Sequence, residues 1–555
     1  MPITEPDRET ASMSFADVWE TVAATVPDAA ALVHGDLVRT WAEFEDRAAR
    51  LAAHLDAAGV GHDAKLACYL YNGPEYLEST FAAFKVRAVP INVNYRYLEA
   101  ELEYLLDNSD AQVVVFDVSF AERIDHVRAS LPKVSLWVCV GASDVHPVPD
   151  WAEDYEEVIA AAEPMLVIER SGDDLWFLYT GGTTGMPKGV MWPHRNLLAT
   201  AAATFAVVKR PVPSTSDEVA AAAQDFHDQG RSVRLLPAAP LMHGTSAITA
   251  VAVLSAGGTV VTLTQRSFDA DELCDTVQRR SITQLTIVGD AFAKPIVSAL
   301  RRALDAGRPY DMSSVKVVVS SGVMWSAAAK DELLEFCSAT LVDSLGSSEG
   351  VGFASSVARR GATEPTATFS LGEHAQVFTE AGDPVVPGSG ERGLLAVGGP
   401  IPIGYYKDPD KSTETFRTFG SRTWSVPGDW ATVGADRTIT LLGRGSVCIN
   451  TAGEKVYPEE VEEVLKLHAA VHDANVVGLP DERWGQSVTA VVALEPGLDP
   501  ADRPDAATLV GHAKQHLAGY KCPKRVVFVE QVQRGPHGKP DYRWAADAAT
   551  SSTSS

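Results

Sequence analysis

The stretch LYTGGTTGMPKGV, residues 178–190, packs four glycines, three threonines and one lysine between two apolar ends. Glycine has no Cβ, so it adopts positive φ easily and lets several backbone N–H groups converge on an anion. The threonine hydroxyls add donors and Lys188 adds charge, so the stretch predicts a phosphate-binding loop. It is not a Walker A loop, in which Ser or Thr follows a Gly-Lys pair, because Lys188 stands between Pro187 and Gly189. A flexible surface loop is the alternative.

The size and charge of the chain narrow the functional class. Its 555 residues are too many for one ordinary domain, so we expect two or more units. Lys and Arg number 47 against 73 Asp and Glu, a formal net charge of −26, which argues against binding to nucleic acid or to an anionic membrane. A local group of cations can still bind a single nucleotide.

The cysteines and the N-terminus point to the cytoplasm. The six cysteines are scattered singly and form no C-x-x-C pair, which disfavours a zinc site or a disulfide framework. The first 20 residues are acidic and lack the basic and then apolar profile of a signal peptide. No apolar run reaches the roughly 18 residues that a transmembrane helix needs. We therefore expect a cytoplasmic protein with no transmembrane segment.

The fold is predicted from the order of the periodic segments. Helical and strand-like segments alternate up to about residue 370, which indicates βα units and mainly parallel sheets. From about 371, closely spaced glycines, prolines and short strands predict a small antiparallel β subdomain. We expect the polar stretch 209–232 to be a surface excursion with a helix over the substrate site. The predicted class is α/β, with a large domain over 1–443, a small mobile α+β domain over 444–543 and a disordered tail over 544–555.

The glycine-rich stretch resembles the phosphate loop of the adenylate-forming (AMP-binding) superfamily, which includes acyl-CoA synthetases, luciferases and peptide-synthetase adenylation domains. Further segments resemble that superfamily in the same order along the chain: PAAPLMHGT (237–245), DSLGSSEG (343–350), IPIGYYKDPDKSTETF (401–416), WSVPGDW (424–430), LLGRGSVCINTAGEKVYPEEVE (441–462) and GPHGKPDYR (535–543). The resemblance implies that a carboxylate attacks the α-phosphate of ATP, and that a thiol then displaces AMP from the acyl-adenylate. It also implies ATP, Mg²⁺ and CoA as reactants or cofactors.

The resemblance assigns catalytic roles residue by residue. Lys539 matches the lysine that reaches the α-phosphate and the substrate carboxylate, and Glu349 matches the residue that holds Mg²⁺. Ser348 matches a hydroxyl position that contacts the α-phosphate. Lys188 lies on a loop expected to be mobile, so its loss should matter less than that of Lys539. His243 takes an aromatic position near the acyl carboxylate, although a histidine satisfied within the core is the alternative.

A larger set of residues is predicted to bind the nucleotide. Asp429 matches the carboxylate that accepts hydrogen bonds from the ribose, and Arg444 also touches the ribose unless it only caps a strand. Leu345 replaces an aromatic residue found in many relatives, so we expect adenine to pack on an aliphatic face. The remaining candidates are Thr180, Gly181, Gly182, Thr183, Thr184 and Gly185 in the loop, Ser320, Ser321 and Gly322 in one turn, and Asp343, Ser344, Gly346 and Ser347 before Ser348.

Two half-reactions in one site imply a C-terminal domain that swings. In relatives the hinge lies two residues after the arginine, and here that position is Ser446 rather than Asp or Lys. The segment TAGEKVYP, residues 451–458, resembles the loop that lines the pantetheine channel in the second half-reaction. Gly453 would leave room for the pantetheine chain, with Glu454 beside it.

The acid itself is left open. Several passages resemble an actinobacterial acyl-CoA synthetase branch that includes enzymes of fatty acid and steroid side-chain metabolism. We expect small residues to line the acyl pocket (244–246, 289–291, Ser320 and Gly322), so a bulky or long carboxylate fits better than acetate. Asp290 could instead recognise a hydroxyl or an amine, and an aryl acid is not excluded. The resemblance weakly favours a homodimer.

Two other functions remain at this stage. One is an adenylate-forming enzyme that passes the acyl group to a carrier protein, an amine or a nitrite-type acceptor. The other is a nucleotide-binding sensor, which would be expected to lack Lys539 or Glu349, yet both are present.

Overall fold

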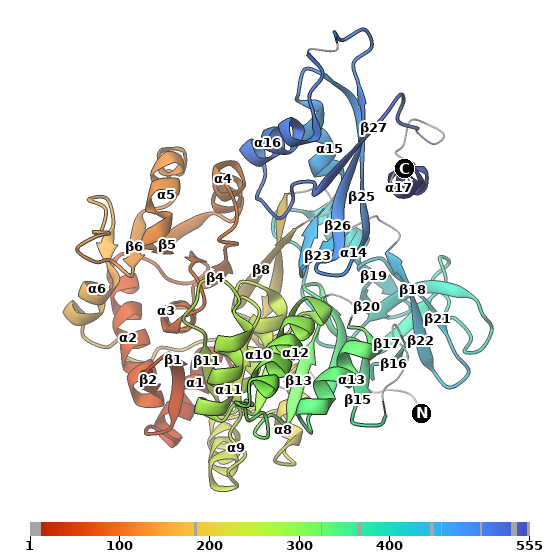
Figure 1. Ribbon diagram of the computed structural model, residues 1–555. Helices are drawn as coiled ribbons and strands as arrows, with labels where there is room; N and C mark the ends of the chain where they lie inside the picture. Colours follow the sequence, from red (N-terminus) through yellow and green to blue (C-terminus); the bar gives the residue numbers. More distant parts are fainter. Residues whose placement is uncertain are drawn as a thin grey trace.

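The computed structural model describes residues 13–181, 186–322, 325–362, 368–444, 449–456, 458–499, 502–533 and 541–551. Their strands form two large sheets in the N-terminal part, up to residue 444, and a smaller sheet in the part from 449 on, here called the C-terminal domain. In Figure 1 the C-terminal domain stands above the two large sheets, next to β8. Strands therefore belong to a different sheet on either side of residues 445–448.

The first large sheet is parallel except at one edge. Its strand order is β7-β6-β5-β3-β4-β8-β9, and only β9 runs antiparallel to its neighbour. The predicted βα alternation is confirmed here. Its strands are β3 (Lys65–Tyr69), β4 (Val89–Asn92), β5 (Ala111–Asp117), β6 (Leu136–Val140), β7 (Glu153–Asp154), β8 (Leu175–Gly181) and β9 (Pro187–Pro193). The helices are α2 (Trp41–Ala57), α3 (Pro74–Lys85), α4 (Glu99–Asn108), α5 (Ala121–Val127) and α6 (Tyr155–Ala161).

The second large sheet has a parallel half that borders the site. This half contains β1 (Ala30–His34), β10 (Arg234–Pro237), β11 (Thr259–Thr262), β12 (Gln284–Ile287), β13 (Val317–Ser320) and β14 (Thr340–Ser347), with β2 (Leu37–Thr40) antiparallel at the edge. The helices that accompany it are α1 (Phe15–Thr25), α7 (His194–Ala199), α8 (Ala202–Ala206), α9 (Ser216–Asp228), α10 (Gly244–Ser255), α11 (Ala270–Arg280), α12 (Gly289–Asp305) and α13 (Ala327–Phe336).

The antiparallel strands that the sequence predicted from about 371 continue this second sheet. Strand β16 pairs with β15 on one side and β22 on the other, so main-chain hydrogen bonds join the two regions. The strands are β15 (Gly350–Ala358), β16 (Thr368–Leu371), β17 (Ala375–Phe378), β18 (Arg392–Val397), β19 (Phe416–Phe419), β20 (Arg422–Ser425), β21 (Asp429–Val433) and β22 (Thr438–Arg444), with the helix α14 (Pro409–Thr415).

Helix α9, in the polar stretch 209–232, does not cover the site. Its buried residues Val219, Ala222 and Phe226 pack into the core cluster that includes Trp19 and Val22 of α1. These apolar residues recur at helical spacing, so one face of α9 is buried while the opposite face remains polar. The expected helix over the substrate site is instead α8, which follows α7 and lines the cavity described below.

The C-terminal domain surrounds a small apolar core. Its sheet has the order β24-β23-β26-β25, with β27 parallel to β26. Valines at alternating positions of the long central strands pack against the apolar faces of two helices. The elements are β23 (Ile449–Thr451), β24 (Glu454–Val456), β25 (Val471–Asp481), β26 (Gly485–Leu494), β27 (Arg525–Val529), α15 (Pro458–Lys466) and α16 (Ala506–His516).

The prediction of a disordered tail is wrong for residues up to 551, because helix α17 spans Tyr542–Ser551. Ala545 and Ala549 are fully buried in a cluster with Val477 of β25 and Val491 of β26. The Ala-rich composition that suggested disorder also favours a helix, and residues four apart lie on the same helical face. Residues 552–555 lie outside the described part of the chain.

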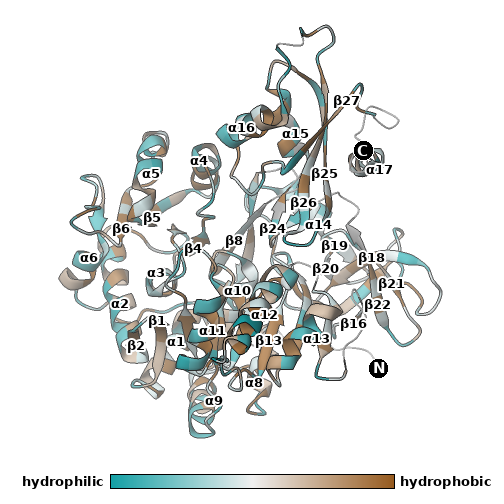
Figure 2. Ribbon diagram, viewed as in Figure 1, coloured by the Kyte–Doolittle hydropathy of each residue, from teal (hydrophilic) through white to brown (hydrophobic). Residues whose placement is uncertain are grey.

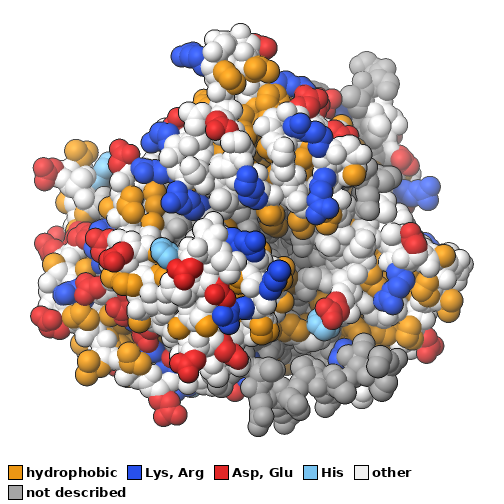
Figure 3. Space-filling model, turned by 90° about the horizontal axis from the view of Figure 1, so that it is seen from below, with side chains coloured by type: hydrophobic (Ala, Val, Ile, Leu, Met, Phe, Trp, Pro, Cys, Tyr) orange, Lys and Arg blue, Asp and Glu red, His pale blue; other side chains and the backbone are white. Residues whose placement is uncertain are grey.

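The surface is charged and the interior apolar. Figure 2 shows hydrophobic residues along the central strands and hydrophilic ones on peripheral helices such as α5. On the face in Figure 3, side chains of both charge signs lie among apolar ones. Among the described helices, none is both long enough and apolar enough to cross a bilayer.

Helix α17 should add measurably to stability. We expect Ala549→Asp to lower the free energy of unfolding by at least about 2 kcal/mol, because the new carboxylate is buried without a partner. Thr550→Asp, on the exposed side of the same helix, is the matched control. Urea unfolding of both variants checks this, and an equal effect of the two substitutions would mean that the helix does not pack in solution.

Candidate active site

A cavity of about 540 Å³ lies where the two large sheets meet the C-terminal domain. One part of its lining is the face of β12, β13 and β14, and another part comes from α10 and α8. At the end near the C-terminal domain the lining includes Asn94, Arg96, Tyr520 and Lys521. The cavity therefore extends from the domain interface along the sheet.

Many residues predicted from sequence meet in this cavity. They come from separate parts of the chain, which the ends of β8, β13, β14 and β23 and the start of α10 bring together: Thr180, His243, Ser321, Gly322, Ser344, Gly346, Ser347, Ser348, Gly453 and Glu454. Because β8 lies in the first sheet and β14 in the second, the cavity joins the two sheets. Gly182, Thr183, Thr184, Gly185, Ser446 and Lys539 lie outside the described residues.

Strand alternation separates the candidates on β14. Ser344 and Gly346 line the cavity, whereas Asp343 and Leu345 point to the other face of the sheet. Asp343 accepts a hydrogen bond from Lys330 at 2.9 Å, and burial raises the pKa of its carboxyl group. Leu345 is partly buried against the apolar cluster around Phe353 and does not line the cavity, so the packing of adenine on it stays a prediction.

The predicted acyl-pocket residues on α12 are only neighbours of the cavity. Residues 289–291 do not line it, whereas Val288 and Phe292 on either side do. The Asp290 carboxylate accepts hydrogen bonds from the backbone N–H of Ser326 at 2.8 Å and from its hydroxyl at 3.1 Å. It therefore holds the start of α13, and the proposal that Asp290 recognises a polar group on the acid is not supported.

Two small candidates also have structural partners. The Ser320 hydroxyl is fully buried and accepts a hydrogen bond from the Gly289 N–H at 2.9 Å. The Ser246 hydroxyl donates to the Ala239 carbonyl at 3.0 Å. Neither residue lines the cavity, while Gly244, Thr245 and Gly322 of the same predicted set do.

Glu349 is positioned where a cation could be held beside the cavity. The Tyr405 hydroxyl donates to its Oε1 at 2.8 Å, and Glu349 as a residue is 8% exposed. The preceding residue is held as well, since the Trp192 indole N–H donates to the Ser348 carbonyl at 2.9 Å. Glu349 directly follows Ser348, which lines the cavity together with Thr180. Its carboxylate is a hard oxygen donor, which fits Mg²⁺ with phosphate oxygens as its other ligands.

Lys188 is held in place by an ion pair. It lies on β9, and its Nζ is 2.5 Å from Oδ2 of Asp408, the residue before α14. The expectation that this lysine belongs to a mobile loop is corrected, because the strand and the ion pair both restrain it. Its side chain does not line the cavity.

The two residues predicted to bind ribose are neighbours. Asp429 begins β21, and its Cα pairs directly with that of Arg444 at the end of β22. Directly opposed residues of antiparallel strands lie within about 5.5 Å of each other. The sheet therefore places these two positions side by side. They lie at the end of the N-terminal part, since Arg444 is the last residue described before 449.

Glu454 connects the C-terminal domain to the cavity. Its Oε1 accepts a hydrogen bond from the Arg96 guanidinium at 2.7 Å and lies 3.1 Å from Nε2 of His243. Burial opposes ionisation of Glu454, but His243, Arg96 and Lys521 outweigh it and lower the pKa of its carboxyl group. His243 is thus a cavity residue. The core histidine is His194, whose pKa burial lowers to about 4.

Gly453 approaches the N-terminal part very closely. Its φ is +85°, and a Cβ at this position would lie 2.8 Å from Cγ1 of Val288. Both the backbone conformation and the contact therefore require glycine.

A buried ion cluster that sequence reasoning missed lies next to this contact. Lys521 forms ion pairs with Glu101 of α4 and with Glu460 of α15, the latter at 2.7 Å. Glu460 is mostly buried and its Oε2 has no partner in the described structure, so burial raises the pKa of its carboxyl group to about 7. No local sequence pattern signals these residues, because Glu101 and Lys521 lie 420 positions apart.

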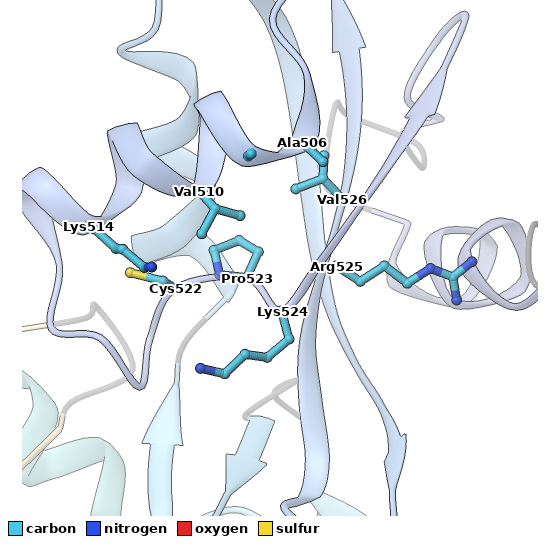
Figure 4. A pocket seen from close by; sticks show the side chains of 9 residues that line it. Ala506, Val510, Lys514, Cys522, Pro523, Lys524, Arg525 and Val526 are labelled. Atoms are coloured by element: carbon cyan, nitrogen blue, oxygen red, sulfur yellow. The ribbon is translucent and has the colours of Figure 1, made fainter.

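A second cavity, of about 470 Å³, lies within the C-terminal domain between α16 and the start of β27 (Figure 4). Three basic residues, Lys514, Lys524 and Arg525, are among its lining residues. It contains none of the residues predicted from sequence, so the first cavity remains the candidate active site.

Two protein families match this chain and define the class of protein to which it belongs. Residues 19–406 match the AMP-binding enzyme family, and residues 460–539 match the AMP-binding enzyme C-terminal domain. The chain belongs to the AMP-binding enzyme family.

Among its relatives, the medium/long-chain-fatty-acid–CoA/3-oxocholest-4-en-26-oate–CoA ligase of Mycobacterium marinum is 41% identical, covering 97% of this chain and 96% of that one. The 3-oxocholest-4-en-26-oate–CoA ligase of Rhodococcus rhodochrous is 40% identical, with the same coverage. The solved amide bond synthetase McbA of Marinactinospora thermotolerans is 23% identical and superposes with a TM-score of 0.77, covering 96% of this chain and 99% of that one. At that identity the last match supports the α/β fold alone.

Glu460 should make stability depend on pH. Because its pKa of about 7 lies above the ordinary glutamate value of 4.5, the folded protein binds an extra proton between these values. The stabilisation is complete below pH 4.5 and is lost as the pH rises through about 7. We expect Glu460→Gln to reduce the fall in unfolding free energy between pH 5 and 7.5 by about 1 to 3 kcal/mol.

Urea unfolding at several pH values measures this fall. Glu482→Gln, which changes an exposed glutamate of the same domain, gives the baseline. Equal pH dependence in wild type and Glu460→Gln would contradict the assignment.

Proposed function

We propose that this chain is an ATP-dependent, AMP-forming acid–CoA ligase that activates a long or bulky carboxylate. The observation that carries the proposal is the single cavity that joins hydroxyl groups beside Glu349, an apolar channel and the domain interface. Near full-length relatives that are named CoA ligases support the same activity.

The shape of the cavity supports the proposed acid. Beyond His243 its lining becomes aliphatic, with Ile248, Ala252, Val317 and Val319 among the residues. Apolar surface of this kind binds hydrocarbon through burial, and polar acids would lose hydration there. Fatty acids and steroid side-chain acids, the substrates in the relatives' names, are therefore the first candidates.

In the first half-reaction, a carboxylate oxygen of the acid attacks the α-phosphorus of ATP. The bond to the β-phosphate oxygen breaks and pyrophosphate leaves. We propose that Lys539 neutralises the two reacting anions, and that Ser348 and Thr180 donate hydrogen bonds to phosphate oxygens. Glu349 would hold Mg²⁺, which neutralises phosphate charge when bound.

In the second half-reaction, the CoA sulfur attacks the acyl carbon. The bond to AMP breaks, and the thiol proton is lost to solvent. The described contact between the domains, with Gly453 and Glu454 at the cavity, suits this step because the interface residues Arg96 and Tyr520 line the same cavity. We propose that the C-terminal domain rotates about the segment after Arg444 to bring Lys539 in for the first step.

Two other functions would give different results in a turnover assay. A carrier protein, an amine or a nitrite-type acceptor would use the same adenylate, and a sensor would bind ATP without turnover. A feruloyl-CoA synthase from Amycolatopsis sp., 30% identical and covering 92% of this chain, keeps aryl acids on the list of test substrates. A cytoplasmic location and a homodimer stay predictions.

The experiment that tests the proposal is a turnover assay with Mg-ATP and a panel of fatty, steroid and aryl acids, with and without CoA. Pyrophosphate release and an acyl-CoA product identified by mass would support the ligase. Adenylate without thioester would indicate another acceptor, and ATP binding without pyrophosphate release would indicate a sensor.

Lys539→Ala should separate the two half-reactions. We expect acid-dependent pyrophosphate release to fall at least 100-fold, because the reacting anions lose a preorganised cation. CoA transfer from supplied acyl-adenylate should remain near the wild-type rate. Lys316→Ala, at an exposed lysine far along the chain, is the control. Equal loss of both half-reactions would refute the role of Lys539.

Gly453→Ala should have the opposite effect. The new methyl group would lie against Val288 at the cavity, so we expect thioester formation to fall about tenfold or more while adenylation changes little. Gly497→Ala is a matched control, since Gly497 has φ +84° but open space around its Cβ position. If both variants lose the two half-reactions to the same extent, backbone strain rather than the channel is responsible.

A further inference from the structure

The deep end of the cavity is formed by the amino ends of parallel strands. On β13, Val317, Val319 and Ser321 line the cavity, which is the alternation expected for one face of a strand. On β12, Gln284 and Val288 line it, and Leu285 and Ile287 point to the core on the other side. The same face of the sheet therefore runs from the reaction end to the deep end.

Two elements give the same length for this channel. Val288 lies four positions after Gln284, which at 3.3 Å per residue is about 13 Å. Opposite, α10 begins beside His243 and lines the cavity as far as Ala252, eight residues beyond Gly244, which at 1.5 Å per residue is about 12 Å. An acid whose carboxylate lies near His243 thus reaches Gln284 with atoms roughly 12 to 13 Å away.

Gln284 is a polar residue in an apolar part of the wall. Its strand neighbours are Leu235 of β10 and Val317 of β13, and Val233 also lines the cavity here. A glutamine amide offers two N–H donors and one carbonyl acceptor. Within the described residues, the Gln284 side chain forms no hydrogen bond with another protein group, although it is half-buried.

Two of the hydroxyl groups that line the cavity differ from Gln284 in this respect. The Thr249 hydroxyl donates to the Thr245 carbonyl at 2.7 Å, and the Thr200 hydroxyl donates to the Leu197 carbonyl at 2.7 Å. Both residues line the cavity, but their protons are engaged within their own helical turns. The amide of Gln284 keeps both its donors and its acceptor available.

We propose that Gln284 determines specificity by hydrogen bonding to an oxygen at the far end of the acid. This inference rests on the proposed function, and it narrows the substrate to an elongated apolar acid with a distal hydroxyl or keto group. An unsubstituted hydrocarbon would leave the amide facing apolar atoms. A bound acid would shield the amide from water. The site therefore favours the oxygenated acid, because a polar group that loses water without gaining a partner costs free energy.

The test compares two acids of equal length, one with a distal hydroxyl group and one with a methyl group. Acyl-CoA formation is measured for each acid with the wild-type protein, and the ratio of the two kcat/KM values is the readout. We expect the hydroxylated acid to be preferred about fivefold or more, the value of one hydrogen bond. In Gln284→Leu, which keeps a similar volume, the ratio should fall to one or below.

Val317→Leu is the matched control, since it changes the shape of the same deep end without changing its polarity. Its ratio should stay close to that of the wild type. A wild-type ratio of one, or an unchanged ratio in Gln284→Leu, would overturn this inference while leaving the ligase activity in place. Failure of the wild type to form acyl-CoA from any acid of the panel would instead overturn the proposed function.

Discussion

The arrangement of the active site depends on charges that are buried where two domains meet. Lys521 of the C-terminal domain is 3% exposed, and it pairs with Glu101 of the N-terminal part and with Glu460 of its own domain. Glu454 is paired in the same way with Arg96 and His243. A buried charge without a partner is strongly unfavourable, so these groups hold the domains in register rather than simply adding stability.

That register decides which residues face the cavity. Pairing of Glu454 fixes the turn before it, and Gly453 can then lie against Val288 only because it has no side chain. At the interface, the backbone of Gly453 and the ion pairs of Glu454 thus form one end of the cavity. The other end is closed by strands and helices of the N-terminal part, whose side chains are mostly aliphatic. The cavity therefore has a polar end, where the reaction takes place, and an apolar end, where the acyl chain binds.

The sequence predicted the family and the residues of its motifs better than the three-dimensional contacts that those residues form. The glycine-rich stretch and the later motifs have characteristic residues at short spacing, so the family, the α/β fold and a minority of the cavity residues, such as His243, Ser348 and Glu454, could be predicted. The face of the sheet on which each side chain lies was harder to predict. Asp343 and Leu345 lie between lining residues in the sequence, yet they point to the opposite face of β14. Contacts between distant segments, such as Lys521 with Glu101 or Asp290 with Ser326, have no local signature. The same limit applies to α17, whose buried face becomes apparent only against β25 and β26.

The central claim is that one cavity holds the acyl chain along the sheet and the reacting carboxyl at the domain interface. The most direct measurement is a crystal structure with a non-hydrolysable acyl-adenylate analogue that carries a long acyl chain. We predict acyl density between α10 and the face of β12, β13 and β14, with the acyl carbonyl beside His243 and the chain end near Gln284. Density for the chain outside this channel, with the channel still closed around its own side chains, would contradict it.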